Sequence, residues 1–273
     1  MAQAKTTIAT KKSSGFKFPA LLVIILCFIV SHLIFHLIFG QVDNFTNDLR
    51  EEAAPGNYLG IVYLGGFVVP FLMGMFIIVL VYSVERFLSI NKAKGSGKIE
   101  NFLSTVKANL KSGNIDAAIS ASNKQKGSVA NVVQAGLHKY KEMEANQTLI
   151  TDQKIININK EMEEATILEL PMLQKNLNIL ATLASVSTLI ALFGTVLGMI
   201  RAFAALATSG TPDTAALAQG ISEALINTAI GIFTSAIAII SYNYFSGLID
   251  DLTASIDEIG FSITQTFASK DKQ

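Results

Sequence analysis

Long apolar segments alternate with charged segments along this chain. Four segments carry almost no charge, namely residues 18–40, 58–83, 176–200 and 215–249. Each is long enough to cross about 30 Å of hydrocarbon as a helix that rises about 1.5 Å per residue. The pattern therefore predicts an all-α fold, a polytopic membrane helical bundle with four spans.

The polar segments between the spans indicate how the chain is oriented. Residues 1–17 carry four lysines and no acid, whereas residues 41–57 carry one arginine and four acids. Lysine and arginine accumulate on the cytoplasmic side of membrane proteins, so we expect both termini to be cytoplasmic. The resulting layout is a cytoplasmic N-terminus (1–17), an extra N-terminal span (18–40), a periplasmic loop (41–57), a second span (58–83), a cytoplasmic helical domain (84–175), a third span (176–200), a short periplasmic loop (201–214), a fourth span (215–249) and a cytoplasmic amphipathic tail helix (250–273).

The first apolar segment has an alternative reading as a cleaved signal peptide, because basic residues precede it. Its apolar run is longer than a signal core, and no Ala-x-Ala sequence follows it. A retained membrane anchor is the favoured interpretation.

The aqueous segments are helical by pattern. One continuous helix is expected over residues 129–169, and Pro171 is expected to kink or restart the chain before the third span. The tail carries an apolar stripe at helical spacing, made of Leu248, Leu252, Ile256, Ile259, Ile263 and Phe267. We expect this stripe to pack against the helix 129–169 of the same or a neighbouring chain, so that the long helices extend into the cytoplasm.

Composition and charge exclude several classes of protein. The chain is 51% hydrophobic and only 15% charged, with 21 basic and 21 acidic residues, which excludes a soluble enzyme and a polycationic nucleic-acid binder. Cys27 is the only cysteine, so no intrachain disulfide forms. His32 and His36 lie one helical turn apart, but no third ligand is visible. No catalytic motif, metal site or cofactor is predicted.

Glu223 is the one charged residue between Asp213 and Asp250, inside the fourth span. Burying an ionised carboxylate there costs several kcal/mol unless the group is paired or wetted. An ionisable residue within a membrane span is a functional-site candidate. The alternative is a structural or interfacial glutamate.

Small and polar residues follow Glu223 along one side of the fourth span. At 100° per residue, Asn227 and Thr234 fall on its side and Thr228 borders it. The opposite side is apolar. The third span carries a matching stripe of Ala181, Ala184, Thr188, Ala191, Thr195, Gly198 and Ala202. Facing hydroxyls and a protonatable carboxylate suit a proton relay better than a cation cage, which would need more oxygen ligands.

The same two spans resemble a known family. The third contains Gly-Thr-Val-Leu-Gly at 194–198, the fourth reads GISEALINTAIG at 220–231, and SYNYF follows at 241–245. Together these segments resemble the MotA/TolQ/ExbB proton-channel family, and most closely its ExbB branch. This chain departs from the family pattern in two places. It has an extra first span, and Ile237 stands where members of the family often have a proline.

The resemblance implies a homopentamer in the bacterial inner membrane around the helices of an ExbD-like single-span protein. Proton flow there would drive a TonB-like protein and energise TonB-dependent transport across the outer membrane. On this reading Glu223, Thr195 and Thr228 form the proton pathway, with Asn227, Thr234 and Thr188 as further pore lining. The alternatives are a TolQ-type or motility-stator subunit and a non-conducting four-span scaffold.

Overall fold

The computed structural model describes residues 20–50, 52–207 and 213–270, and these form helices joined by short loops. The predicted all-α fold is confirmed, and four helical stretches of the described chain are long and apolar enough to cross a membrane. The elements are α1 (Ala20–Ile34), a π-helical turn η1 (Phe35–Phe39), a 3-10 turn η2 (Val42–Asn44), α2 (Tyr58–Tyr63), α3 (Val69–Lys94), α4 (Ile99–Lys111), α5 (Ile115–Gln125), α6 (Gly127–Ala145), α7 (Thr151–Gln174), α8 (Leu177–Ala207) and α9 (Thr214–Lys270).

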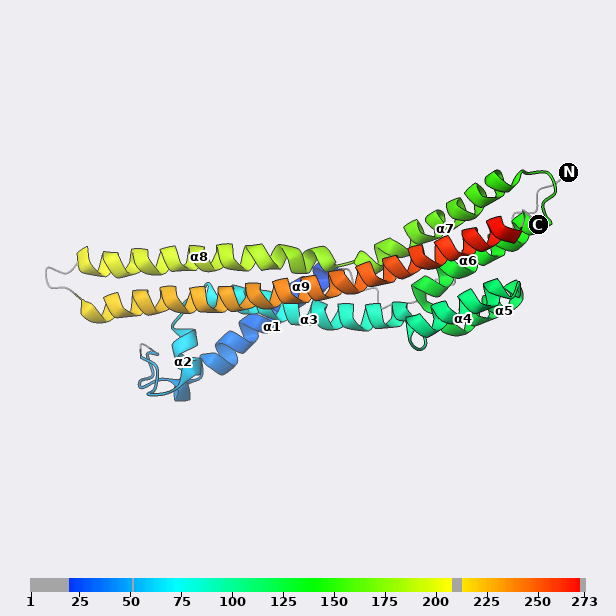
Figure 1. Ribbon diagram of the computed structural model, residues 1–273. Coiled ribbons are helices and arrows are strands. Elements are labelled where there is room, and N and C mark those ends of the chain that lie inside the picture. The colour runs from blue at the N-terminus through cyan, green and yellow to red at the C-terminus, as the bar shows by residue number, and fades with distance from the viewer. Residues whose placement is uncertain (1–19, 51, 208–212, 271–273) are drawn as a thin grey trace.

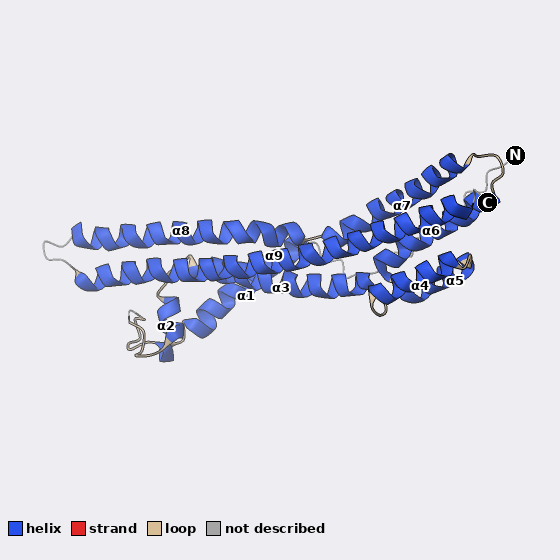
Figure 2. Cartoon of the chain, viewed as in Figure 1, coloured by secondary structure: helices blue, strands red, loops and turns tan. Residues whose placement is uncertain are grey.

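A long hairpin of α8 and α9 forms the spine of the molecule (Figure 1). Helix α3 packs along α9, and α1 packs on α3 before diverging from it towards α2. The last part of α9 continues beyond α8 and lies among α4, α6 and α7 at the other end, where every regular element is again helical (Figure 2).

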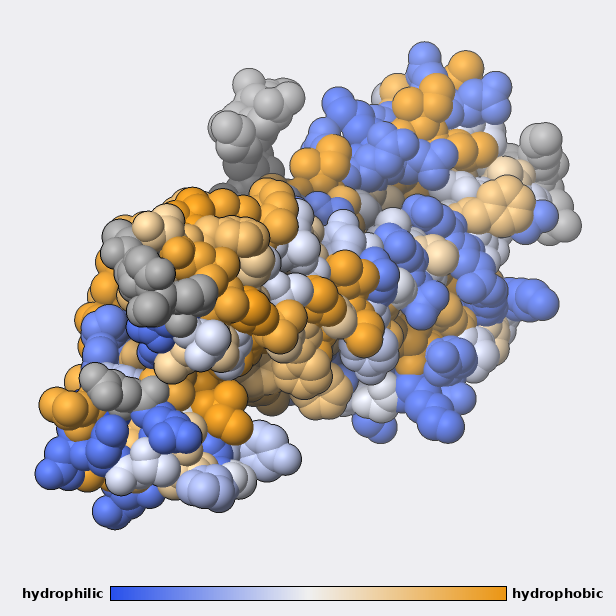
Figure 3. All heavy atoms as spheres, turned by 90° about the vertical axis from the view of Figure 1, so that its left-hand side faces the viewer, coloured by the Kyte–Doolittle hydropathy of each residue, from blue (hydrophilic) through white to orange (hydrophobic). Residues whose placement is uncertain are grey.

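Apolar and hydrophilic surfaces separate along this length. In Figure 3 hydrophobic side chains dominate much of the nearer part of the surface, and hydrophilic ones gather farther back, towards the α4–α7 end. The exposed apolar side chains include many from the four expected spans, such as Leu26, Phe71, Phe193 and Ile240. Exposed apolar side chains of this density suit contact with lipid or with other membrane helices.

The apolar stripe of the tail is buried from Leu252 to Phe267, and Leu248 at its start is partly buried. Ile259 and Ile263 are fully buried, and the ring of Phe267 lies edge-on to Tyr140 with 4.8 Å between centroids. The expected partner, residues 129–169, is however divided into two helices, α6 and α7, because the chain turns at 146–150, and α4 also packs against the tail. The Asn146 side chain accepts hydrogen bonds from the backbone of Thr148 and Leu149 there, a turn that Asn favours. The expectation of one continuous helix over 129–169 is therefore wrong.

The joint between α7 and α8 is held by a buried arginine. Pro171 lies inside α7, and the helix stops only at Gln174, before Asn176 adopts a positive φ of 61°. Arg86 of α3 pairs with Glu85 and donates to the Leu173 carbonyl at 3.1 Å. Because the last carbonyls of a helix lack partners within it, this contact stabilises the end of α7.

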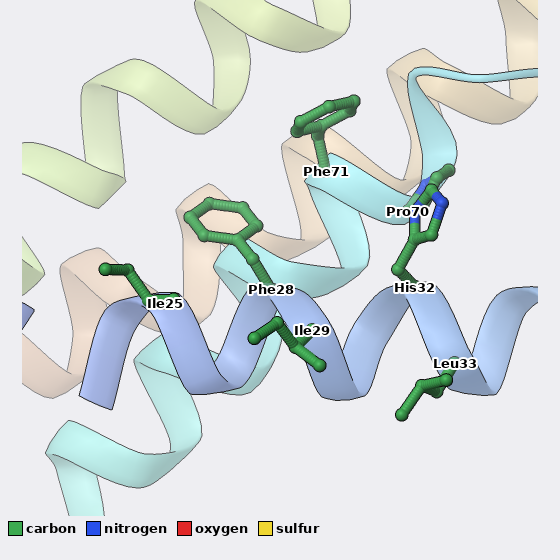
Figure 4. A pocket seen from close by; sticks show the side chains of 7 residues that line it. All are labelled: Ile25, Phe28, Ile29, His32, Leu33, Pro70 and Phe71. Carbon is green, nitrogen blue, oxygen red and sulfur yellow. The ribbon is translucent and has the colours of Figure 1, made fainter. Parts of the chain in front are cut away.

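The extra first span is fixed to the start of α3. The Ser31 hydroxyl donates to the Pro70 carbonyl, and the Phe28 ring occupies the space that a side chain on Gly74 would need. An apolar hollow of about 400 Å³ lies between the two helices, and Figure 4 shows the side chains that line it, including Phe28, His32 and Phe71. Among the described residues, no group of three or more His, Cys, Asp or Glu side chains is placed to hold a metal ion.

Candidate functional site

Small residues let α8 and α9 approach each other closely. A β-carbon added to Gly198 would lie 2.7 Å from the Gly220 carbonyl oxygen, and one on Gly231 would collide with Ala191. Small residues at helix interfaces are typical of membrane proteins, where van der Waals packing and hydrogen bonds drive association. The predicted stripes therefore meet at this interface.

Two predicted pathway residues are brought together inside the hairpin. The Thr195 and Thr228 hydroxyl oxygens lie 2.5 Å apart. Both hydroxyls also lie within hydrogen-bonding distance of the Ala224 carbonyl oxygen, at 3.3 Å and 3.0 Å. The pair forms a partly buried polar contact between α8 and α9, and Thr228 lies five residues along α9 from Glu223.

Glu223 has a partner that the sequence analysis did not identify. Its side chain is buried, and both carboxylate oxygens lie close to Nη1 of Arg201, at 2.7 Å and 2.8 Å. Arg201 belongs to α8, which continues to Ala207, although its position had suggested the loop 201–214. In an antiparallel hairpin, residues shortly before the turn lie beside residues shortly after it, and that arrangement is the signal that would have indicated the pair.

A break in the second span faces this ion pair. Residues 64–68 separate α2 from α3, and Gly66 there has a φ of 81°. This left-handed backbone favours glycine, and a β-carbon at Gly66 would also collide with the Glu223 carboxylate. Pro70 lies in the first turn of α3, so the interruption comes from the Gly65–Gly66 turn and not from a proline bend.

Two further contacts join the break to the hairpin. The Asn227 amide nitrogen donates to the Gly65 carbonyl oxygen at 3.1 Å. The guanidinium of Arg201 lies 5.8 Å from the centre of the Phe67 ring, within the range of a cation–π interaction. Residues 65, 66 and 67 thus each contact one polar member of the site.

The remaining predicted residues are dispersed. Asn227 is fully buried, and its Oδ1 atom has no hydrogen-bond partner among the described residues. Thr234 is also buried and donates to the Ile230 carbonyl of its own helix at 2.8 Å. Thr188 is exposed on α8. On α9, then, Glu223 and Asn227 face the broken second span, whereas Thr228 faces Thr195.

Comparison with known proteins shows which protein family the chain resembles. Residues 124–258 match the model of the MotA/TolQ/ExbB proton channel family. This segment, about half of the chain, belongs to that family. The matched residues include Thr195, Arg201, Glu223 and Thr228. This is a family of membrane channel proteins rather than of enzymes, and the four apolar helices fit a multi-pass membrane protein.

Individual relatives carry two different names. The Tol-Pal system protein TolQ of Pseudomonas aeruginosa is 36% identical over 118 residues, which cover 43% of this chain and 51% of that protein. TolQ of Haemophilus influenzae is 46% identical over 78 residues (29% and 34%). The biopolymer transport protein ExbB of Salmonella typhimurium is 36% identical over 84 residues (31% and 34%). The chain thus spans about half, or less, of the length of these relatives.

The family match leaves out one part of the site. It begins at residue 124, so the first span and the broken second span lie outside it. The contacts of Gly65, Gly66 and Phe67 with the hairpin are therefore features of this chain that the match does not describe.

Proposed function

We propose that this protein is an ExbB-like subunit of an inner-membrane proton channel that uses the proton motive force to energise TonB-dependent transport across the outer membrane. The observation that carries the proposal is Glu223, a buried acid in an apolar helix that also fits the family resemblance. A carboxylate in this setting can take up and release a proton as its surroundings change. The chemistry is proton transfer coupled to a conformational change, and the protein is not an enzyme.

In this proposal the polar residues of the hairpin have different roles. Glu223 exchanges the proton or compensates a charge on a partner helix, and Thr195 and Thr228 form the polar lining next to it. Asn227, Thr234 and Thr188 are further lining residues. Thr188 is exposed in the single chain, so it would line a pore only in an assembled ring.

The proposed assembly is a homopentamer that encloses an ExbD-like single-span protein and works on a TonB-like protein. Both termini are cytoplasmic in this arrangement. Exposed apolar side chains on both helices of the hairpin, including Leu192, Phe193, Leu225 and Phe233, give it a surface that lipid, a neighbouring copy or a partner helix can cover. Purification through a tag on this chain, followed by native mass spectrometry, measures the stoichiometry and identifies the partners.

The test is to replace the gene in its own host with the Glu223→Gln variant and to measure uptake of a TonB-dependent ligand. Uptake should fall to the level of a gene deletion, because glutamine keeps the shape of glutamate and loses its titration. Lys92→Gln is the matched control, since Lys92 is an exposed charge near the far end of α3. Full uptake by Glu223→Gln would refute the assignment.

A TolQ-type role is the second candidate, because two of the relatives above are TolQ proteins. The same strains separate the two roles. Loss of uptake with an intact envelope supports the ExbB-like role, whereas detergent sensitivity with normal uptake supports the TolQ-type role.

A further inference from the structure

We propose that Arg201 is a positioning residue that holds Glu223 ionised against the broken second span, and that protonation of Glu223 releases the Gly65–Phe67 segment. The first part concerns the charge of Glu223 before it takes up a proton. The second part rests on the proposed function, because release matters only if Glu223 takes up protons during transport.

The geometry of the ion pair supports the first part. One guanidinium nitrogen lies within 2.8 Å of both carboxylate oxygens of Glu223. Arginine stays charged in proteins, and an opposite charge at this distance favours the ionised carboxylate. The pair explains how an acid that is 4% exposed is tolerated in an apolar helix.

Few other charges face the pair. Arg201 is the charged residue of α8, and the acids on either side of Glu223 along the chain are Asp213, just before α9, and Asp250 within it. Residues 58–83, which contain α2, the break and most of α3, carry no Asp, Glu, Lys, Arg or His. Their titratable groups are the phenols of Tyr58, Tyr63 and Tyr82, and those of α1 and its π-turn are Cys27, His32 and His36. Arg201 therefore dominates the electrostatics at Glu223.

The contacts of the break support the second part. Phe67 lies against the Arg201 guanidinium, Gly66 against the Glu223 carboxylate, and the Gly65 carbonyl accepts from Asn227. Residues 64–68 therefore rest on a surface made by the ion pair. When a proton binds a Glu223 oxygen, an O–H bond forms and the attraction to Arg201 is lost. The contacts that hold Gly66 and Phe67 then weaken together, and loss of the proton restores them.

Infrared spectroscopy of the purified full-length protein tests the charge state without any transport assay. The Glu223 bands are assigned by subtracting the spectrum of Glu223→Gln. We expect a carboxylate band at neutral pH in the wild type and in Arg201→Lys, and a protonated carboxyl band in Arg201→Gln. Lys92→Gln should match the wild type. A protonated Glu223 in the wild type, or an unchanged carboxylate in Arg201→Gln, would overturn the proposal.

A double variant keeps the test informative if Arg201→Gln folds poorly. The Arg201 side chain is about half exposed, whereas Glu223 is buried. Removing Arg201 alone therefore leaves the buried Glu223 charge uncompensated, whereas removing both charges does not. The Arg201→Gln/Glu223→Gln protein should therefore recover the melting temperature and the yield that Arg201→Gln loses. If the double variant instead loses as much melting temperature as the two single variants together, Arg201 does not compensate the charge of Glu223.

Hydrogen–deuterium exchange tests the release. Glu223→Gln imitates the protonated acid, so the amides of residues 64–69 should exchange several-fold faster than in the wild type, while those of α6 stay unchanged. Equal protection of this segment in the two proteins would contradict the release. Failure of the proposed function is a separate outcome, because full transport by Glu223→Gln leaves the infrared result standing.

Discussion

The two halves of α9 bury two different kinds of side chain. In residues 214–241 the buried face consists of small and polar residues, namely Gly220, Glu223, Ala224, Asn227, Gly231, Thr234, Ser235 and Ala238. In residues 242–270 it consists almost entirely of large apolar residues, namely Phe245, Ile249, Leu252, Ile256, Ile259, Ile263 and Phe267, with Thr264. One uninterrupted helix thus packs through small and polar residues in its first half and through large apolar residues in its second half.

The difference follows from the surroundings expected for each half. In water, burial of large apolar side chains drives association, and the second half packs in this way against α4, α6 and α7. In lipid that driving force is missing, so close backbone contact and hydrogen bonds take its place. The first half meets α8 through glycine and alanine, and this leaves room for Glu223, Asn227 and the threonine pair.

The largest stability effect is expected in the second half. Ile259→Ala removes a fully buried side chain and should lower the free energy of unfolding by about 2–5 kcal/mol. Thermal or denaturant unfolding of the detergent-solubilised protein measures this loss. A change of only a few tenths of a kcal/mol would show that the interface of the tail with α6 and α7 does not form.

A smaller loss is expected from Gly231→Ala in the first half. The new β-carbon collides with Ala191 and lies 2.9 Å from the Ser187 carbonyl oxygen, and overpacking of this kind typically costs about 1–3 kcal/mol. Gly247 is the matched control on the same helix, because a β-carbon there meets nothing within 4 Å. Gly247→Ala should be neutral or stabilising by up to about 1 kcal/mol. Equal effects of the two changes would contradict the close approach of α8 and α9.

The smallest effect concerns the end of α9. Lys270 donates to Glu144 of α6, and this hydrogen bond raises the pKa of Lys270 above its ordinary value. The contribution of such a raised lysine is fully present at neutral pH and is lost as the pH rises through its pKa in the folded protein. Both side chains are partly exposed, so Lys270→Ala should cost only about 0.2–1 kcal/mol at neutral pH.

Unfolding of the wild type and of Lys270→Ala at neutral and strongly alkaline pH checks the direction of this pH dependence. The free energies of unfolding of the two proteins should become equal at alkaline pH. A difference that grows with pH would contradict the assignment of this pair.

Charge and periodicity predicted much of this molecule. The lack of charge located the four apolar helices, and the stripes of small residues located the α8–α9 interface. The breaks were harder to predict. Gly65-Gly66 is typical of helix packing in a membrane as well as of a turn, and here the Gly65 carbonyl finds its partner in Asn227, 162 residues away. The same holds for Arg201, whose role depends on the register of the hairpin and not on its neighbours in sequence.

Proton flux tests the central claim most directly, namely that the small and polar half of α9 carries a protonatable site. The complex is purified from its own host through a tag on this chain and reconstituted into liposomes, and proton entry driven by a membrane potential is recorded. We expect flux with the wild type and with Lys92→Gln, and none above empty liposomes with Glu223→Gln. Flux at the wild-type rate through the Glu223→Gln complex would contradict the account.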